Sequence, residues 1–185
     1  NKSGADWNFA KKGMNGSYGY VTRFGKINTI EEAPAVLKGY ERALSGRGYI
    51  WGRTIPLLLK HMLLGTGPDT FIEAFPQNDY VKRYNTSSAM YQEIPSKAHN
   101  MYLQTAVQTG VLSLICLLLF WGFYLKESIC IYWIQKKKDY IGMACCFSVA
   151  GYLMMGVMND SNLATAPLFW TILGLGWAVN HCETV

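Results

Sequence analysis

Three long stretches without any formal charge dominate the C-terminal half of this sequence. They cover residues 98–125, 140–159 and 161–182. A helix needs about 20 mostly apolar residues to cross a bilayer. Three such runs, with so few charges between them, argue against buried helices of a soluble protein. The sequence therefore predicts three transmembrane helices, near residues 101–125, 140–158 and 163–181.

Charge is distributed unevenly along the 185 residues. Residues 1–97 contain 13 Lys and Arg against 8 Asp and Glu, which accounts for the whole net charge of +5. Only 16% of the chain is charged, against about 25% in a typical soluble domain. This composition excludes a disordered chain, a collagen, a coiled coil and an ordinary cytosolic enzyme. We predict a mainly α polytopic membrane protein, with a helical extracytoplasmic region over residues 1–97 and a membrane domain over residues 98–185.

The lysines predict the orientation of the chain. The connection at residues 126–139 contains four lysines, whereas the connection at residues 159–162 contains only Asp160 as a charged residue. Short connections rich in lysine remain in the cytoplasm. We therefore expect the first connection to be cytoplasmic, and the second connection and residues 1–97 to lie outside.

The beginning of the sequence shows no signal peptide. It starts at Asn1 rather than Met, and we expect it to be the C-terminal part of a longer polytopic protein. None of its five cysteines lies within residues 1–97, which excludes a disulfide framework there. No Cys/His spacing resembles a zinc site.

Two helices are predicted outside the membrane. Thr29 is followed three residues later by Glu32, as in a capping box, and favours a helix over residues 30–44. A second helix is predicted from Arg47 to Leu64, with Pro56 kinking or restarting it. The Gly-rich segment at residues 65–68 stops this helix.

The remaining external residues show no helical period. Residues 1–29 are rich in Gly, Asn, Ser and Tyr and are predicted to form a loop, with short strands near residues 18–24. Residues 69–97 mix polar and aromatic side chains and are predicted to be irregular.

His99 and Asn100 stand immediately before the first predicted membrane helix. Asn100 is a favourable N-cap residue. His99 would then lie at the positive end of a helix dipole, beside unpaired backbone amides, where an anion binds readily. The alternative is a histidine that merely lies at the membrane interface.

Arg47 begins the second external helix, one turn before Trp51. Arg53 is six positions further on, about 240° round the helix, so only one of the two arginines should point into a shared site. We prefer Arg47, whose fork can hold phosphate oxygens in a bidentate manner. Arg53 is expected to contact phosphate headgroups. Surface charge and lipid contact are the alternatives for both.

Carboxylates are scarce, and the sequence contains no DxD motif. No metal site is therefore indicated. Asp160 could line a cavity, although ordinary loop polarity explains it equally well. The basic charge is spread out and faces away from the cytoplasm, so no nucleic-acid partner is indicated.

A family resemblance follows from three segments taken together: SGRGYIW, IPLLLKHMLLGTGPDTF and AHNMYLQTAVQTGVLSLICLLLF. Their order resembles the C-terminal domain of the O-antigen ligase and polymerase (Wzy) family, over about residues 44–125. Members are glycosyltransferases of the bacterial inner membrane. They move a glycan from an undecaprenyl diphosphate carrier to a glycan or lipid acceptor outside the cytoplasm.

The resemblance implies roles for particular residues. His99 matches the essential histidine of the family, and Arg47 matches its loop arginine. We further expect Arg53, Trp51, Asn100 and Tyr102 to bind the substrate. The implied enzyme is independent of metal ions and uses no cofactor.

A non-enzymatic alternative is a membrane assembly or transport component with an extracytoplasmic cap. The near absence of ionisable residues in the three predicted spans disfavours transport.

Overall fold

The computed structural model describes residues 9–10, 18–21, 27–30, 33–79 and 94–182. The chain divides into two compact units, one formed by residues 1–56 and 75–95 and the other by residues 57–74 and 96–185. The predicted boundary at residue 97, between an extracytoplasmic region and a membrane domain, stays a prediction. The two units are described separately below.

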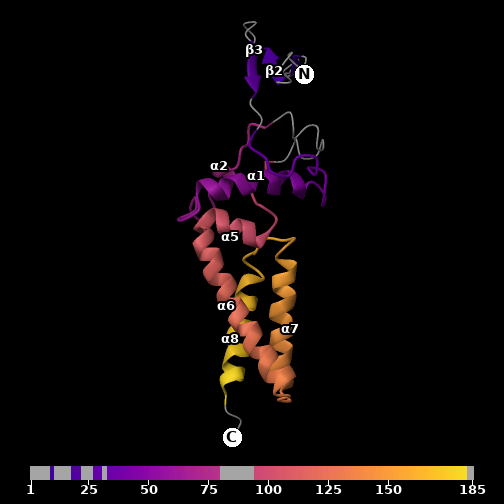
Figure 1. Ribbon diagram of the computed structural model, residues 1–185, viewed down its shortest axis with the longest axis vertical. Helices are drawn as coiled ribbons and strands as arrows, with labels where there is room; N and C mark the ends of the chain where they lie inside the picture. The colour runs from indigo at the N-terminus through magenta and orange to yellow at the C-terminus, as the bar shows by residue number, and fades with distance from the viewer. Residues whose placement is uncertain (1–8, 11–17, 22–26, 31–32, 80–93, 183–185) are drawn as a thin grey trace. The chain divides into compact units, whose positions relative to one another are not determined.

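The first unit begins with a small antiparallel sheet (Figure 1). Its strands, in spatial order, are β1 (Phe9–Ala10), β2 (Tyr18–Val21) and β3 (Ile27–Ile30). Tyr18 lies opposite Ile30, and Val21 lies opposite Ile27. β2 falls within the segment near residues 18–24 where short strands were predicted.

The helix predicted over residues 30–44 is wrong. Thr29, the predicted cap, lies in β3, and the described residues 33–46 form turns. Pro34 has no amide hydrogen to contribute to a helix. Gly39, Leu44 and Ser45 take φ values of 92°, 53° and 58°, and a right-handed helix cannot pass through this region of backbone space. The capping-box pattern is therefore outweighed by the residues that follow it.

Helix α1 (Arg47–Lys60) begins where predicted and ends four residues before Leu64, the predicted end. It continues through Pro56. Gly52 accepts a hydrogen bond from the Val36 amide at 3.0 Å, which attaches the preceding turns to the helix. One further helical turn, α2 (Phe71–Ala74), lies within the segment predicted to be irregular, and its Phe71 is buried.

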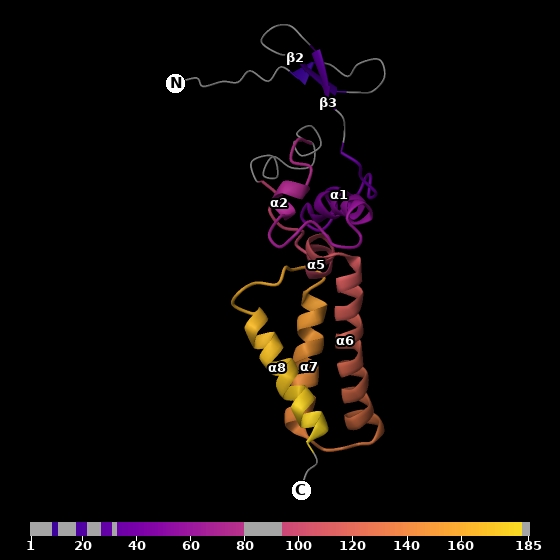
Figure 2. The ribbon, with the colours of Figure 1, turned by 90° about the vertical axis from the view of Figure 1, so that its left-hand side faces the viewer.

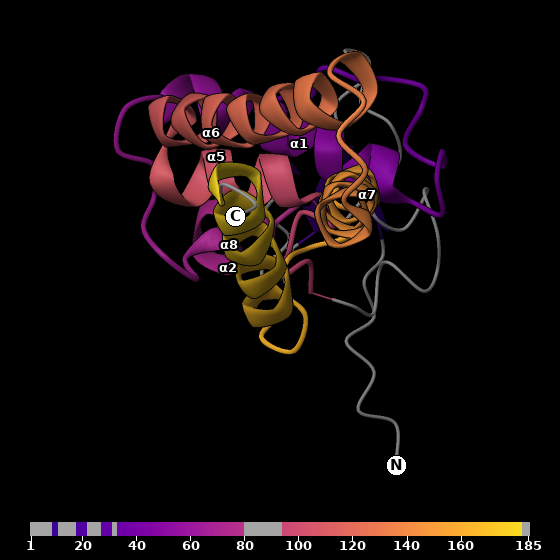
Figure 3. The same ribbon diagram turned by 90° about the horizontal axis from the view of Figure 1, so that it is seen from below.

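The second unit contains a bundle of helices (Figures 1 and 2). They are α5 (Met101–Thr109), α6 (Val111–Ile129), the π-helix η1 (Cys130–Ile134), α7 (Tyr140–Met155) and α8 (Ala166–His181). α7 packs along α8, and both contact α6. Seen from below, α7 and α8 lie on the same side of α6 (Figure 3). The short helix α5 lies across one end of this bundle.

The predicted membrane helix over residues 101–125 is divided and shifted. It is broken at Gly110, and the second part continues beyond Lys126 to Ile134. The resulting helix, Val111–Ile134, has 24 residues and contains an 18-residue stretch with a mean hydropathy of 1.8. Among the described residues, it is the one helix long and apolar enough to cross a membrane. The apolar segment at residues 129–134 extends the helix into a connection that had been predicted to be a loop.

Gly110 lies at the break between α5 and α6, and this position requires glycine for two reasons. Its φ of 93° is unfavourable for any residue with a side chain. A Cβ at this position would also overlap the carbonyl oxygen of Leu63. The Val111 amide donates a hydrogen bond to the Met62 carbonyl at 2.8 Å. The break therefore depends on a tertiary contact with the segment after α1.

Helices α7 and α8 fall within the ranges predicted for the second and third spans. Each has 16 residues, fewer than the roughly 20 that a perpendicular span needs. The packing of α8 on α6 depends on close approach and aromatic contacts. Trp121 lies edge-on to Phe169 with ring centroids 5.9 Å apart, and Gly176 leaves the space that the Tyr124 hydroxyl occupies. Small residues of this kind allow helices to pack closely in lipid.

Polar contacts join the opposite end of the bundle. The hydroxyl of Tyr132 donates to the amide oxygen of Asn180 at 2.7 Å, and the amide nitrogen of Asn180 donates to the Ser128 hydroxyl at 2.9 Å. Asn180 therefore connects α8 to both α6 and η1. In an apolar environment such groups need partners within the protein.

Gly110→Ala should destabilise the protein. The substituted residue must adopt a backbone conformation that costs about 1–3 kcal/mol, and its Cβ meets backbone that cannot rotate away. Thermal unfolding of the purified full chain in detergent measures the change. Gly122→Ala is the matched control, because nothing lies within 4 Å of a Cβ there. Equal melting temperatures for the two variants would contradict this account of the break.

Candidate functional site

Asn100 fixes the beginning of α5 through three hydrogen bonds. Its side-chain oxygen accepts from the Leu103 amide at 2.9 Å, as the N-cap prediction requires, and its side-chain nitrogen donates to the Val157 carbonyl at 2.9 Å. Its backbone amide donates to Asp160 at 3.2 Å. Asn100 is 8% exposed. It therefore joins α5 to the connection between α7 and α8, and its buried groups are satisfied.

His99 lies one residue before this cap in a left-handed conformation, with φ of 51°. Such a backbone is uncommon for a residue other than glycine and is found often at functional sites. The Nδ1 atom of the ring lies 3.4 Å from the Oδ2 atom of Asp160. The side chain of His99 is half exposed, whereas that of Asp160 is 11% exposed. A histidine held through one nitrogen keeps the other for a ligand.

Asp160 makes two contacts with one carboxylate. Oδ1 accepts the Asn100 amide, and Oδ2 faces the His99 ring. The anion expected at the N-terminus of α5 is therefore supplied by the protein itself. The next amide, of Met101, donates to the Gly156 carbonyl at 2.8 Å. The backbone amides that would attract an external phosphate to His99 are largely occupied.

A cavity of about 410 Å³ opens beside this pair. Its polar lining includes Lys97, His99, Asn159 and Asp160. Tyr152 adds an aromatic ring, and its hydroxyl lies 3.1 Å from the Ser161 hydroxyl. The cavity is therefore lined by charged, amide, hydroxyl and aromatic groups together, a set that can bind a polar ligand such as a sugar.

Tyr102 is half-buried and packs against the bundle. Its hydroxyl donates to the Leu153 carbonyl at 2.6 Å, and its ring lies edge-on to Trp121. Burial raises the pKa of this phenol, so the hydroxyl stays protonated. These contacts give Tyr102 a part in packing α5 onto the bundle and do not support the substrate-binding role predicted for it.

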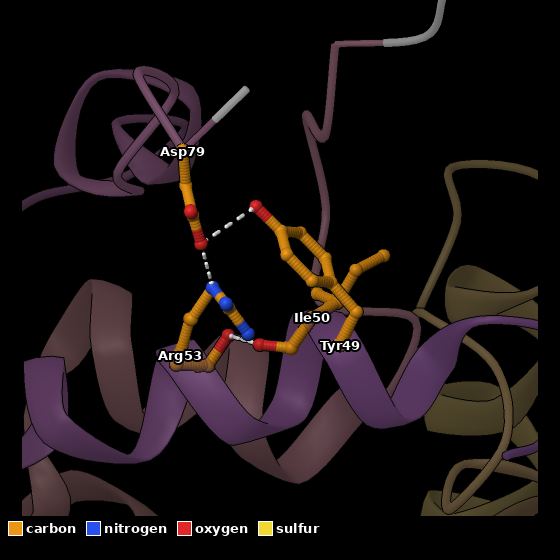
Figure 4. A network of polar contacts seen from close by, with 5 residues as sticks. Tyr49, Ile50, Arg53 and Asp79 are labelled. Atoms are coloured by element: carbon orange, nitrogen blue, oxygen red, sulfur yellow. Dashed lines mark hydrogen bonds and ion pairs between the residues drawn. The ribbon is translucent and has the colours of Figure 1, made fainter. Parts of the chain in front are cut away.

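The first unit holds the other predicted site residues. Arg53 is 2% exposed and forms an ion pair with Asp79, which is equally buried (Figure 4). Its guanidinium lies 4.0 Å from the ring centre of Tyr49, and the Tyr49 hydroxyl donates to the same carboxylate at 3.4 Å. This arrangement does not favour the headgroup contact predicted for Arg53.

Arg47 begins α1 and is partly exposed. Its Nε atom has no hydrogen-bond partner among the described residues, and the first turn of α1 contains no acidic residue. A cation at the positive end of a helix whose first turn lacks an acidic residue favours binding of an anion. Trp51, one turn further on, is half-buried and has contacts of its own.

The predicted residues fall into two groups. Arg47, Trp51 and Arg53 belong to the first unit, and His99, Asn100 and Tyr102 belong to the second. In the second unit, His99 and Asn100 both contact Asp160. In the first unit, Arg53 contacts Asp79. Residues 80–93, part of the loop predicted to be irregular, lie outside the described residues.

Sequence reasoning missed two partners. Asp79 carried no recognisable signal, because a lone acidic residue in an irregular segment does not identify a distant arginine. Asp160 carried a partial signal as the single charge in its connection. No group of three or more His, Cys, Asp or Glu side chains in the part of the chain that the structure describes could hold a metal ion.

The fold and this site together define a membrane-associated helical protein, with a histidine–aspartate pair beside a cavity at one end of its bundle. The sequence profile of a family described as O-antigen ligase matches residues 13–118. This match covers more than half of the chain and includes all six predicted site residues. The chain therefore belongs to the O-antigen ligase family, as the three sequence segments indicated. No curated protein and no solved structure matches it.

Breaking the Arg53–Asp79 pair should destabilise the first unit. Asp79→Ala leaves a buried guanidinium without its counter-charge, a change that typically costs about 3–5 kcal/mol. Thermal unfolding of the purified full chain measures this. The double variant Arg53→Met with Asp79→Leu removes both charges and should recover most of the loss. A double variant less stable than Asp79→Ala would show that the unpaired charge is not the cause of the lost stability.

Proposed function

We propose that this protein is part of a multi-pass membrane glycosyltransferase of the O-antigen ligase or polymerase type. It transfers a glycan from an undecaprenyl diphosphate carrier to a glycan or lipid acceptor on the outer side of the bacterial inner membrane. Membership of the family supports this class of function. In this proposal α7 and α8 also cross the membrane, as the sequence predicts.

The observation that carries the proposal is the His99–Asp160 pair at the cavity. The carboxylate faces Nδ1 and so favours the tautomer in which Nδ1 bears the proton. Nε2 is then the free basic nitrogen. A base of this kind can accept a proton from a hydroxyl that comes within hydrogen-bond distance. Asp160 stabilises the imidazolium that results, as a carboxylate does beside other catalytic histidines.

The transfer then proceeds as follows. The acceptor hydroxyl oxygen forms a bond to the anomeric carbon of the donor glycan, and the bond from that carbon to the diphosphate oxygen breaks. His99 takes the hydroxyl proton, and the diphosphate leaves with the bonding electron pair. The charge that develops on the diphosphate requires a cation. Arg47 is the residue we assign to it, because a guanidinium remains charged and binds two phosphate oxygens at once.

His99→Ala should abolish transfer without lowering expression. General-base catalysis contributes about 10²–10⁴-fold to such reactions. The full-length gene is expressed in a host that displays a lipid-linked glycan, and surface polysaccharide is compared on a gel. Glycan that accumulates on the carrier in the variant supports the proposal, and the banding separates ligation from chain growth. Wild-type polysaccharide at equal expression would remove His99 from the mechanism.

Asp160→Asn provides the finer comparison. Asparagine keeps an oxygen for the Asn100 amide but loses the charge beside the imidazole. A partly exposed ion pair contributes up to about 1 kcal/mol, so we expect up to roughly fivefold lower transfer, a smaller loss than in His99→Ala. Undiminished transfer would mean that Asp160 serves only to accept the hydrogen bond from the Asn100 amide and does not assist His99.

Arg47→Lys should be nearly as damaging as Arg47→Ala, since lysine cannot bind two phosphate oxygens in a fork. The same polysaccharide assay tests both. An active Arg47→Lys enzyme would exclude the bidentate role. Binding of undecaprenyl diphosphate without any transfer, in the wild type, would favour the alternative of a non-enzymatic assembly component.

A further inference from the structure

Three consecutive residues after α1, Met62, Leu63 and Leu64, expose large apolar side chains, with Leu63 74% and Leu64 87% exposed. Leu59, in the last turn of α1, is exposed as well. Contiguous apolar exposure of this kind marks an interaction surface. Because these residues belong to the second unit, their surroundings can be read from the bundle.

Three backbone hydrogen bonds fix this segment to the junction of α5 and α6. The Met62 carbonyl accepts from the Val111 amide at 2.8 Å. The Thr66 amide donates to the Val107 carbonyl at 2.8 Å, and the Gly67 amide donates to the Gln108 carbonyl at 3.0 Å. The exposed leucines are therefore held beside the residue at which the candidate membrane span begins.

The position of the α5–α6 junction relative to the membrane indicates that lipid covers the exposed leucines. Val111 is the first residue of the span, so it lies where lipid headgroups meet acyl chains. Leu112, the next residue, is 60% exposed, and exposed apolar side chains therefore occur on both segments at this level. Lys60 is exposed at the end of α1. A lysine beside leucines suits the anionic phosphates of the headgroup layer, because its stem follows the apolar surface while its charge remains in water.

We propose that Leu59–Leu64 is an interfacial membrane anchor. Its leucines insert among the lipid acyl chains of one leaflet, about 5–10 Å below the headgroup boundary as in other interfacial segments. The anchor and the three backbone hydrogen bonds together hold α5, and with it the N-terminal cap at Asn100, at a constant depth in the interface. This inference does not depend on the proposed transferase activity.

Depth-dependent fluorescence quenching tests the anchor on the full chain. A polarity-insensitive fluorophore is attached to Leu63→Cys or Leu64→Cys, in a background where the accessible native cysteines Cys116, Cys130 and Cys182 are alanine. Cys145 and Cys146 are buried and are retained. The protein is reconstituted in vesicles of phosphatidylethanolamine and phosphatidylglycerol. These contain lipids with a nitroxide near the glycerol or near the end of the acyl chain, and iodide serves as the aqueous quencher.

Two labelled control sites of the same unit calibrate the result. Leu118→Cys lies within the span and should be quenched best by the deep nitroxide, whereas Glu73→Cys replaces an exposed carboxylate on α2 and should be quenched by iodide. At Leu63 and Leu64 we expect quenching by the shallow nitroxide and protection from iodide. Quenching by iodide would show that the segment lies in water. Protection from all three quenchers would show that protein covers it. Either result would overturn the anchor.

Discussion

The need to satisfy polar groups where the chain enters the apolar bundle determines the arrangement of the second unit. These groups are buried, so the protein must supply their hydrogen-bond partners. Asn100 supplies them, with its side chain bonded to Leu103 and Val157 and its amide bonded to Asp160. The beginning of α5 is thereby tied to the α7–α8 connection. The position of His99, the opening of the cavity and the placement of Asp160 all follow from this junction.

The other end of α5 shows the same dependence on distant contacts. Gly110 turns the chain from α5 into α6 because its left-handed backbone passes under the carbonyl of Leu63. A straight helix from Met101 onward would project α5 beyond the end of the bundle, because the candidate span begins only at Val111. The break instead keeps nine residues at the end of the bundle, where both the cap and the apolar segment after α1 can contact them. Both ends of α5 are thus held by chain segments remote in sequence.

These dependences explain what the sequence could predict. The uncharged runs predicted the helices of the bundle, and Asn100 predicted the N-cap of α5. Both predictions succeed because local sequence controls these features. The break at Gly110 could not be foreseen, since a glycine in an apolar run also fits a continuous helix, and its conformation here is required by Leu63. The helix predicted over residues 30–44 is wrong because the prediction relied on the capping pattern. The helix-breaking effect of Pro34 and Gly39 is stronger than that pattern. The family motifs identified His99 and Arg47, whereas Asp79 and Asp160 were found only through spatial proximity.

The charge of Asp160 affects which part of the proposed substrates could bind beside it. A carboxylate beside the cavity repels a diphosphate, and it already occupies the amide that would attract one. Lys97 lines the same cavity, so a cation and a carboxylate offset each other there and leave a mixed polar surface. Arg47 shows the opposite character, since it stands at the positive end of α1 with no acidic residue in the first turn. The proposed transfer assigns acceptor activation to the first kind of surroundings and diphosphate binding to the second.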